Sequence, residues 1–309
     1  MDTEKFVVLK KSEEATVPKL SDELYDIICR YVELNRYLQE INQLYDILQF
    51  NIERFFINYE LGSDDCVVRR DNFKSDHSNF IAVNAYIMNI LSAGRSLVDS
   101  TDNCVKSTYG EKTDQYIVYK KCVLSMVYDS NFSYRFFYDL RNFAQHNHLP
   151  VSVNDGFCCF DTAQILNTPH FKSNKNVRTE LEKLHKQIKG KYKDNFRISL
   201  SMCLIEYLVG VAQIYKGFWG NIKDLLFELK ISIDLEIERT PELLEHNNEM
   251  FNGYILYQIP DKEGWQAFAP YSDTESYYEN CMKVAQDFFE GVNQEYETLK
   301  EHFREISFE

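Results

Sequence analysis

The sequence predicts a mainly α-helical protein, built as a bundle of long antiparallel helices with one or two short β-hairpins. Its 309 residues are 44% hydrophobic, which is enough to bury a sizeable core. Only 11 glycines and 6 prolines are present, which disfavours a turn-rich all-β fold. Apolar residues recur at intervals of three and four over several long stretches, as they do on the buried face of a helix.

The first predicted helix covers 20–59 and begins at Ser21, a good N-cap followed by two acidic residues. At ~1.5 Å per residue, it would be ~60 Å long. The helix that starts at Phe132 has an aromatic face and is stopped by Pro150. The most apolar helix is predicted either to be continuous or to break at Gly217 or Gly220. The other helices are expected over 79–100, 116–128, 176–193, 195–231 and 274–303.

Hairpins are predicted at two places. Strand-like residues on either side of Asp155-Gly156, a dipeptide typical of tight hairpin turns, give a short hairpin near 151–160. A second candidate joins 254–259 to 265–271, and residues 1–19 are expected to form an arm or an edge strand. We therefore expect a helical domain over 1–227 that contains the first hairpin, and an acidic α+β extension over 228–309.

Charge is unevenly distributed along the chain. The net charge is −14, but 228–309 holds 19 acidic and 6 basic residues, so 1–227 is nearly neutral with 29 acidic and 28 basic residues. Within the latter, 172–197 has nine Lys and Arg against three acids. This segment is either a solvated helix face or a surface for an RNA backbone. Its candidate RNA-binding residues are Lys183, Lys186, Lys189, Lys191 and Lys193.

Several classes of site and location are disfavoured. The eight cysteines include no C-x-x-C pair, and the histidines outside 146–148 have no ligand-like spacing, so neither a metal site nor a disulfide framework is predicted. Phosphate-loop, dinucleotide-binding, serine-hydrolase and zinc-protease motifs are missing, and no cofactor is expected. The charged N-terminus and the interruption of 198–219 by Glu206 and Lys216 favour a cytoplasmic protein that does not span a membrane.

Functional groups are concentrated at the end of the helix that starts at Phe132. The run Arg141-Asn142-Phe143-Ala144-Gln145-His146 is followed by His148. This arginine-polar-x-x-x-histidine pattern resembles the signature of the HEPN superfamily, whose members are small all-α domains and in many cases endoribonucleases. The resemblance implies a homodimeric, metal-independent RNase that leaves a 2',3'-cyclic phosphate and a 5'-hydroxyl. It also implies a toxin or phage-defence role, with an antitoxin or regulatory protein as a partner.

The residue types suit this chemistry. A histidine titrates near neutral pH and can transfer the protons when the 2'-hydroxyl attacks phosphorus. The always-charged guanidinium of Arg141 can bind two phosphoryl oxygens, and Asn142 can donate to a third or orient the imidazole. On an ideal helix Arg141 and His146 lie ~140° apart, whereas Arg141 and His148 share a face. Either the last turn unwinds or two chains share the site, and we favour His146 over His148.

A structural interpretation of the same residues remains open. Arg141 can form an ion pair, and the two histidines can cap a helix end. The aromatic residues of this helix favour core and dimer packing over base stacking. In that case the protein would be a non-catalytic helical module that binds RNA, a nucleotide or a protein partner.

Overall fold

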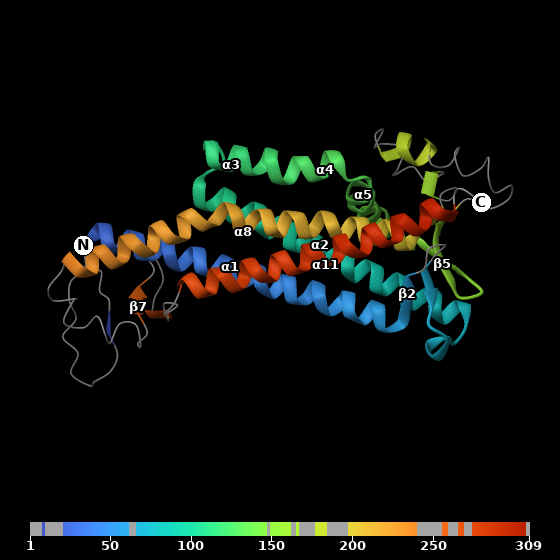
Figure 1. Ribbon diagram of the computed structural model, residues 1–309. Coiled ribbons are helices and arrows are strands. Elements are labelled where there is room, and N and C mark those ends of the chain that lie inside the picture. Colours follow the sequence, from blue (N-terminus) through green and yellow to red (C-terminus); the bar gives the residue numbers. More distant parts are fainter. Residues whose placement is uncertain are drawn as a thin grey trace. The chain divides into compact units, whose positions relative to one another are not determined.

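The computed structural model describes residues 8–9, 21–61, 66–146, 149–161, 165–166, 177–183, 197–239, 255–258, 265–268 and 274–306. Within them the fold is mainly helical with two small antiparallel sheets, which confirms the predicted class. The chain divides into two compact units, one of Met1–Gln39 with Trp219–Val284 and the other of Glu40–Phe218 with Ala285–Glu309. The helices α1 (Asp22–Asn58), α8 (Leu200–Arg239) and α11 (Thr274–Ile306) supply residues to both units (Figure 1).

Residue 228, where the C-terminal extension was expected to begin, lies within α8. This helix runs without a break through Gly217 and Gly220, both of which were candidate break points. The change in charge balance near residue 228 therefore coincides with no end of a helix. The assignment of 1–227 and 228–309 as separate domains stays a prediction.

The first unit combines helical segments with a three-stranded antiparallel sheet. The predicted N-cap is confirmed, because Ser21 Oγ accepts a hydrogen bond from the Leu24 amide at 3.1 Å. Strands β7 (Ile255–Gln258) and β8 (Trp265–Phe268) form the predicted second hairpin, and β1 (Val8–Leu9) pairs with β7. The remaining residues of the predicted N-terminal arm lie outside the described part of the chain.

Aromatic side chains form much of the core of this unit. Trp219 of α8 is fully buried, and its ring meets those of Tyr277 and Tyr278 of α11 edge-on. The buried Tyr31 hydroxyl of α1 is hydrogen-bonded to Thr274 Oγ1 at 2.8 Å. The hydroxyl therefore gains a polar partner at the point where α11 begins.

The second unit contains most of the remaining helices. Helix α2 (Asp76–Tyr109) is longer than predicted, because Ser75 caps its first turn and Gly110, with φ of 93°, ends it. It is followed by α3 (Asp114–Tyr119), a π-helical segment η2 (Lys120–Ser125), α4 (Met126–Ser130) and α5 (Phe132–His146). The predicted helix over 116–128 is thus present with a π-helical middle that its apolar spacing did not predict.

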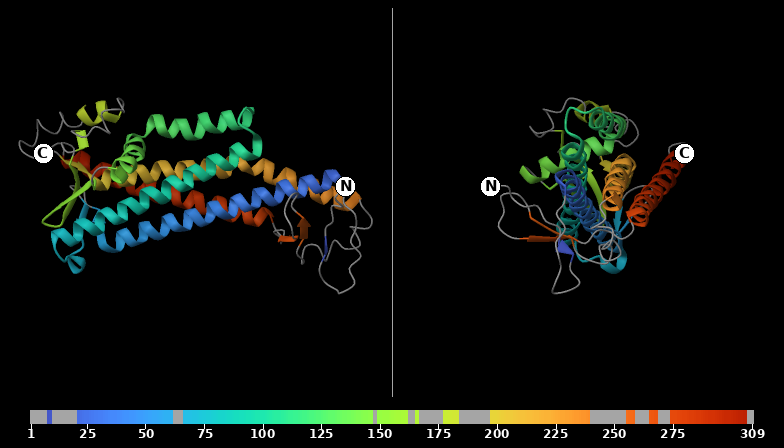
Figure 2. Two further views of the ribbon diagram at one scale, coloured as in Figure 1. Left: turned by 180° about the vertical axis from the view of Figure 1, so that it is seen from behind. Right: turned by 90° about the vertical axis from the view of Figure 1, so that its left-hand side faces the viewer.

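We call α3, η2 and α4 together the arm. The arm packs on the part of α8 that belongs to this unit, where two glycines admit its side chains (Figures 1 and 2). A Cβ at Gly217 would lie 2.8 Å from Val123 Cγ1, and one at Gly210 would lie 3.2 Å from Val127 Cγ1. Seven residues apart, these glycines lie on one face of α8. These glycines allow the arm and α8 to approach each other closely.

The sheet of the second unit is built around the predicted first hairpin, β4 (Val151–Asn154) and β5 (Phe157–Asp161). The turn residues Asp155 and Gly156 both have positive φ, 50° and 82°, as a type I′ turn requires. Three further strands were not predicted. These are β2 (Tyr59–Leu61), β3 (Cys66–Val68) and β6 (Arg197–Ser199), which complete the order β2-β3-β5-β4, with β6 also paired to β5. A single 3₁₀ turn, η1 (Arg70–Asn72), follows β3.

Side chains of α2 hold this hairpin. The Asn84 amide donates to the Val151 carbonyl at 2.8 Å and accepts from the Val151 amide at 2.9 Å, while it is itself buried. The Asp76 carboxylate accepts from the backbone amides of Asp155 and Gly156. Both ends of β4 are therefore fixed to α2 by polar contacts.

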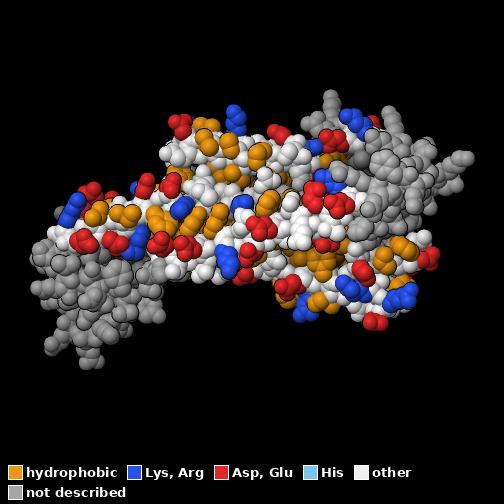
Figure 3. All heavy atoms as spheres, in the orientation of Figure 1, with side chains coloured by type: hydrophobic (Ala, Val, Ile, Leu, Met, Phe, Trp, Pro, Cys, Tyr) orange, Lys and Arg blue, Asp and Glu red, His pale blue; other side chains and the backbone are white. Residues whose placement is uncertain are grey.

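Positive, negative and apolar side chains alternate over the described surface (Figure 3). Over the arm, the same view shows hydrophobic side chains, and Ile117, Val118 and Met126 are exposed there. By length and composition α2 is able to cross a membrane, but core helices of soluble proteins meet the same criterion, and half of its most apolar window is buried.

Candidate functional site

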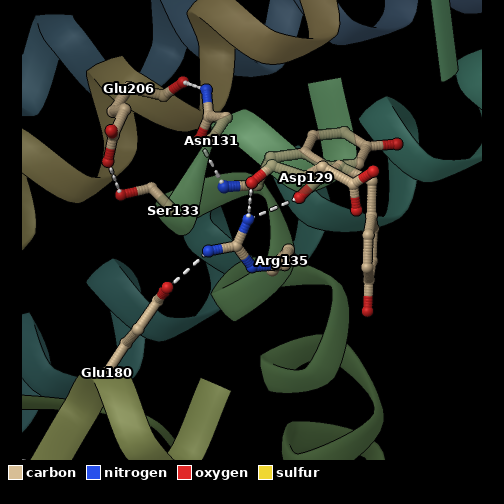
Figure 4. Close-up of polar contacts among 8 residues, drawn as sticks. Asp129, Asn131, Ser133, Arg135, Glu180 and Glu206 are labelled. Carbon is tan, nitrogen blue, oxygen red and sulfur yellow. Dashed lines mark hydrogen bonds and ion pairs between the residues drawn. The ribbon is translucent and has the colours of Figure 1, made fainter. Parts of the chain in front are cut away.

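Helix α5, which carries the predicted site, begins at a group of polar contacts with α8. Asn131 caps it, because its Oδ1 accepts from the Tyr134 amide at 2.8 Å. The Asn131 side chain also donates to the Glu206 carbonyl at 2.7 Å. Ser133 Oγ donates to the Glu206 carboxylate, and Figure 4 shows both side chains directed toward Glu206. These contacts fix the start of α5 on α8.

Arg135 is the first arginine of α5, and its role is structural. It is 8% exposed, and its Nη1 donates to the carbonyls of Tyr128 and Asp129, both at 2.6 Å. Its Nη2 forms an ion pair with Glu180, on a short helical segment over 177–183, at 2.6 Å (Figure 4). Arg135 thereby satisfies carbonyls at the end of α4 that the helix leaves unpaired.

The aromatic face of α5 belongs mainly to the core. Tyr134, Phe136 and Phe137 are buried, and Phe137 stacks on Tyr207 of α8 with ring centroids 4.9 Å apart. Phe136 meets Phe160 of β5 edge-on at 5.3 Å. Packing on both α8 and the sheet holds the helix in place along this face. The side chain of Phe143, which was predicted to join this cluster, is outside the described part.

Arg141 lies one helical turn beyond Phe137 and is partly exposed. Its Nε is buried without a hydrogen-bond partner, and with the described residues Arg141 makes no hydrogen bond or ion pair. It lines a recess of about 10 Å³ together with Gly94, Arg95, Tyr138 and Tyr207. That volume suits a single water at most, so a larger ligand would have to bind at the mouth of the recess.

Arg95 of α2 is the second cation of this recess. Its Nη2 lies 2.7 Å from Asp99 Oδ1, and its guanidinium lies 4.3 Å from the centroid of the Tyr138 ring. Burial acts to lower the Arg95 pKa, but the negative charge and hydrogen bond of Asp99 outweigh it, so the pKa is raised. Arg95 therefore stays positively charged, and its guanidinium is positioned by Asp99 and by the Tyr138 ring.

The fields of both arginines reach the buried hydroxyl of Tyr207. Burial raises the pKa of this hydroxyl above its usual value, whereas the charges of Arg95 and Arg141 act to lower it. Tyr207 can approach α2 this closely because residue 94 is glycine, where a Cβ would lie 2.3 Å from the Tyr207 hydroxyl oxygen. The recess is thus lined by two arginines and by several aromatic side chains.

A wider cleft of about 270 Å³ continues from the recess. Arg95, Val98, Tyr134 and Tyr138 line both of them. The other walls of the cleft come from α2 and from the arm. They consist of Asp99, Asp102, Lys120, Leu124, Ser125, Tyr128 and Asp129.

The helical backbone of α5 extends to His146. Unwinding therefore does not occur between Arg141 and His146, and on a regular helix these positions remain ~140° apart. The side chains of Asn142, His146 and His148, three of the four predicted catalytic residues, lie outside what the structure describes. Arg141 is the one whose surroundings are known, and the choice between His146 and His148 stays a prediction.

Of the five lysines predicted to bind RNA, only Lys183 falls in the described part of the chain. It is exposed on the helical segment over 177–183. Lys186, Lys189, Lys191 and Lys193 lie outside the described residues. Among the described residues, no group of three or more His, Cys, Asp or Glu side chains is placed to hold a metal ion.

The sequence did not single out Arg95 or Asp99, and it placed Tyr138 only among the aromatic residues of α5 that favour core and dimer packing. Arg95 and Asp99 are four residues apart, a spacing that predicts an ion pair on a helix face. This spacing does not reveal that α2 meets α5 at that point, which brings Arg95 over Tyr138. At Gly94 the helix that approaches α2 closely is α8, through Tyr207.

No protein-family model, no curated protein and no solved structure matches the chain.

Proposed function

We propose that the protein is a metal-independent endoribonuclease in which Arg141 binds the phosphate that is cut. The observation that carries this proposal is the state of Arg141, a partly exposed cation without a polar partner among the described residues, next to the second cation Arg95. A guanidinium that only satisfied the fold would be expected to have partners like those of Arg135. Arg141 is instead available to an anion.

In the proposed reaction the 2'-oxygen of a ribose bonds to the adjacent phosphorus, and the bond from phosphorus to the 5'-oxygen breaks. One base removes the proton of the 2'-hydroxyl, and one acid protonates the departing 5'-oxygen. Arg141 stabilises the negative charge that gathers on the phosphoryl oxygens. The products are a 2',3'-cyclic phosphate and a 5'-hydroxyl, and we assign proton transfer to His146, with His148 as the alternative.

A homodimer completes this proposed site. Because α5 stays helical from Arg141 to His146, these two positions lie ~140° apart around one helix. A shared cleft would place Arg141 of one chain opposite the histidine of its partner. Light scattering tests this step, since a strict monomer that still cuts RNA would contradict it.

The test of activity is incubation of the purified protein with total RNA in EDTA. Arg141→Ala, His146→Ala and His148→Ala are compared with wild type. Loss of Arg141, or of the histidine that transfers protons, is expected to slow cleavage about 100-fold or more. Matched controls are Arg239→Ala, an exposed arginine of α8, and His77→Ala, an exposed histidine of α2. Both controls should cleave as wild type does.

Two outcomes would contradict the proposal. Cleavage that needs a divalent metal, or that survives both Arg141→Ala and the two histidine substitutions, would remove the mechanism. If wild type does not cut RNA and these substitutions mainly lower thermal stability, the fold serves as a binding module instead. If cleavage is found, induced expression in growing cells tests the toxin or phage-defence role, because an unregulated RNase should arrest growth in an Arg141-dependent manner.

A further inference from the structure

The cleft between α2, the arm and α5 has nearly balanced charges in its lining, which suits a neutral polar group better than an anion. Its charged lining consists of two cations, Arg95 and Lys120, and three acids, Asp99, Asp102 and Asp129, for a balance of −1. The recess beside it is lined by Arg141 and by Arg95, which is paired with Asp99, and no acid lines the recess itself. A phosphate is therefore favoured at the recess and disfavoured in the cleft.

The polar groups of the cleft are partly engaged. Asp102 Oδ1 accepts from the Tyr116 hydroxyl at 3.1 Å, and its other carboxylate oxygen has no hydrogen bond to the described residues. Lys120 Nζ lies 5.8 Å from the centroid of the Tyr116 ring and forms no ion pair within the described part of the chain. The cleft thus offers an acceptor in Asp102 and a donor in Lys120, each close to Tyr116, while Asp129 supplies a further carboxylate to the lining.

Aromatic rings complete the lining. Tyr128 and Tyr138 meet edge-on with centroids 6.2 Å apart, and Tyr138 is 37% exposed. A volume of about 270 Å³ is slightly below the ~300–1,000 Å³ of pockets that enclose drug-sized ligands, so the cleft suits a smaller planar group. Aromatic side chains are the usual stacking partners of unpaired bases in single-stranded RNA.

Lys120, Leu124 and Ser125 contribute to the cleft from the π-helical segment η2. Among the described elements, η2 is the one that departs from α-helical winding within a helix. Such wider turns are rare and occur frequently at functional sites. The irregular backbone is therefore found at the wall of this cleft.

We propose that the cleft binds the guanine base of the nucleotide whose phosphate meets Arg141. This inference rests on the proposed RNase function. Guanine has two neighbouring N–H groups, and the Asp102 carboxylate would accept a hydrogen bond from each. Next to them guanine has a carbonyl oxygen, to which Lys120 would donate. Adenine and cytosine present an acceptor where guanine presents its ring N–H, and uracil has one N–H between two carbonyls. The cleft's donor and acceptor pair fits guanine best.

The position of the cleft along α2 agrees with this assignment. Asp102 lies two turns beyond Arg95, roughly 10 Å at ~1.5 Å per residue. This is of the order of the length of one nucleotide from its phosphate to the far edge of its base. One nucleotide can thus contact the recess and the cleft together.

Binding of mononucleotides tests this inference separately from cleavage. The full-length protein is titrated calorimetrically with GMP, AMP, CMP and UMP, and GMP is expected to bind at least about tenfold more tightly than the others. Asp102→Asn, whose amide oxygen still accepts from Tyr116, and Lys120→Met should each remove most of this preference. The matched controls Asp155→Asn, at an exposed turn, and Lys121→Met, next to Lys120 and outside the cleft lining, should retain it.

Cleavage mapping on the same variants separates the two proposals. Equal binding of the four nucleotides, or a GMP preference that survives both cleft substitutions, overturns the guanine site even if the protein cuts RNA in an Arg141-dependent manner. GMP binding that depends on Asp102 and Lys120 in a protein that cuts no RNA supports the guanine site and overturns the RNase proposal. If both hold, cuts in RNA should concentrate at guanine and lose that preference in Asp102→Asn.

Discussion

Gly94→Ala tests how tightly α2 and α8 meet at the recess. The added Cβ would lie 2.3 Å from the Tyr207 hydroxyl oxygen, whereas ordinary contacts begin at 3.4 Å, so one of the two groups must move by about 1.1 Å. Tyr207 has little freedom to do so. It is buried and stacked between Phe137, at 4.9 Å, and Tyr134, at 6.0 Å between centroids.

Two effects of opposite sign decide the stability of Gly94→Ala. Forcing extra volume into a packed core costs about 1–3 kcal/mol. Replacing glycine by alanine inside a helix contributes about 1 kcal/mol of stability. At Gly220, also within a helix, nothing lies within 4 Å of an added Cβ, so Gly220→Ala should show the helical gain alone. The free energies of unfolding of the two variants should therefore differ by about 1–3 kcal/mol.

Urea unfolding followed by circular dichroism measures this difference. Tyr207→Phe removes the clashing oxygen and leaves the ring carbon Cζ 3.2 Å from the new Cβ, a contact that a small shift relieves. Adding Tyr207→Phe to Gly94→Ala should therefore recover stability relative to Gly94→Ala, as a coupling between the two sites. A close contact between Gly94 and Tyr207 is refuted if Gly94→Ala is as stable as Gly220→Ala, or if the pair of substitutions shows no coupling.

Three further outcomes are expected. Asn84→Ala should lower the free energy of unfolding by about 2–4 kcal/mol, measured by urea unfolding, because the buried amide and carbonyl of Val151 lose their partner. Arg135→Ala should lower the midpoint of thermal unfolding far more than Arg178→Ala, whose part-exposed ion pair is worth at most about 0.5 kcal/mol; equal shifts would contradict the role given to Arg135. Burial is the largest of the causes that raise the pKa of Tyr116 to about 12, and the hydrogen bond with Asp102 and the negative charge of Asp102 act in the same direction. Because the unfolded phenol ionises near pH 10, the contribution of Tyr116 to the free energy of unfolding should be fully present below pH 10 and should decrease between pH 10 and pH 12. Phenolate absorbance should then rise together with the loss of helical circular dichroism.

The long helices follow from local patterns in the sequence. The apolar spacing after Ser21 predicted a helix over 20–59, and the structure has one over Asp22–Asn58. The turn at Asp155 and Gly156 was predictable because its residues tolerate the positive φ that the turn requires. Strand β3 was missed because it has only three residues and pairs both with β2, which is equally short, and with β5, some ninety residues further along the chain. Such long-range pairing leaves little trace in local composition.

The candidate site was only partly predictable for a related reason. Arg141 was identified from a motif within one helix. Arg95 was not, because its function as a neighbour of Arg141 depends on the packing of α2 against α5. The charge pattern of Arg95 and Asp99 predicts an ion pair equally well on any exposed helix. Asp102 and Lys120 line one cleft only because the arm folds back along α2.

The π-helical segment also sets the rotational phase of the arm. Before it, Tyr116 and Tyr119 direct their hydroxyls at Asp102 and Thr101 of α2. From within it onward, Val123 and Val127 fit against the glycines of α8. A π-helical turn holds about one residue more than an α-helical turn, and each residue rotates the chain by about 100°. The π-helical turn therefore lets a single continuous helix serve two different neighbours, because regular α-helical winding of the same sequence would rotate one half of the arm away from its partner by about 100°.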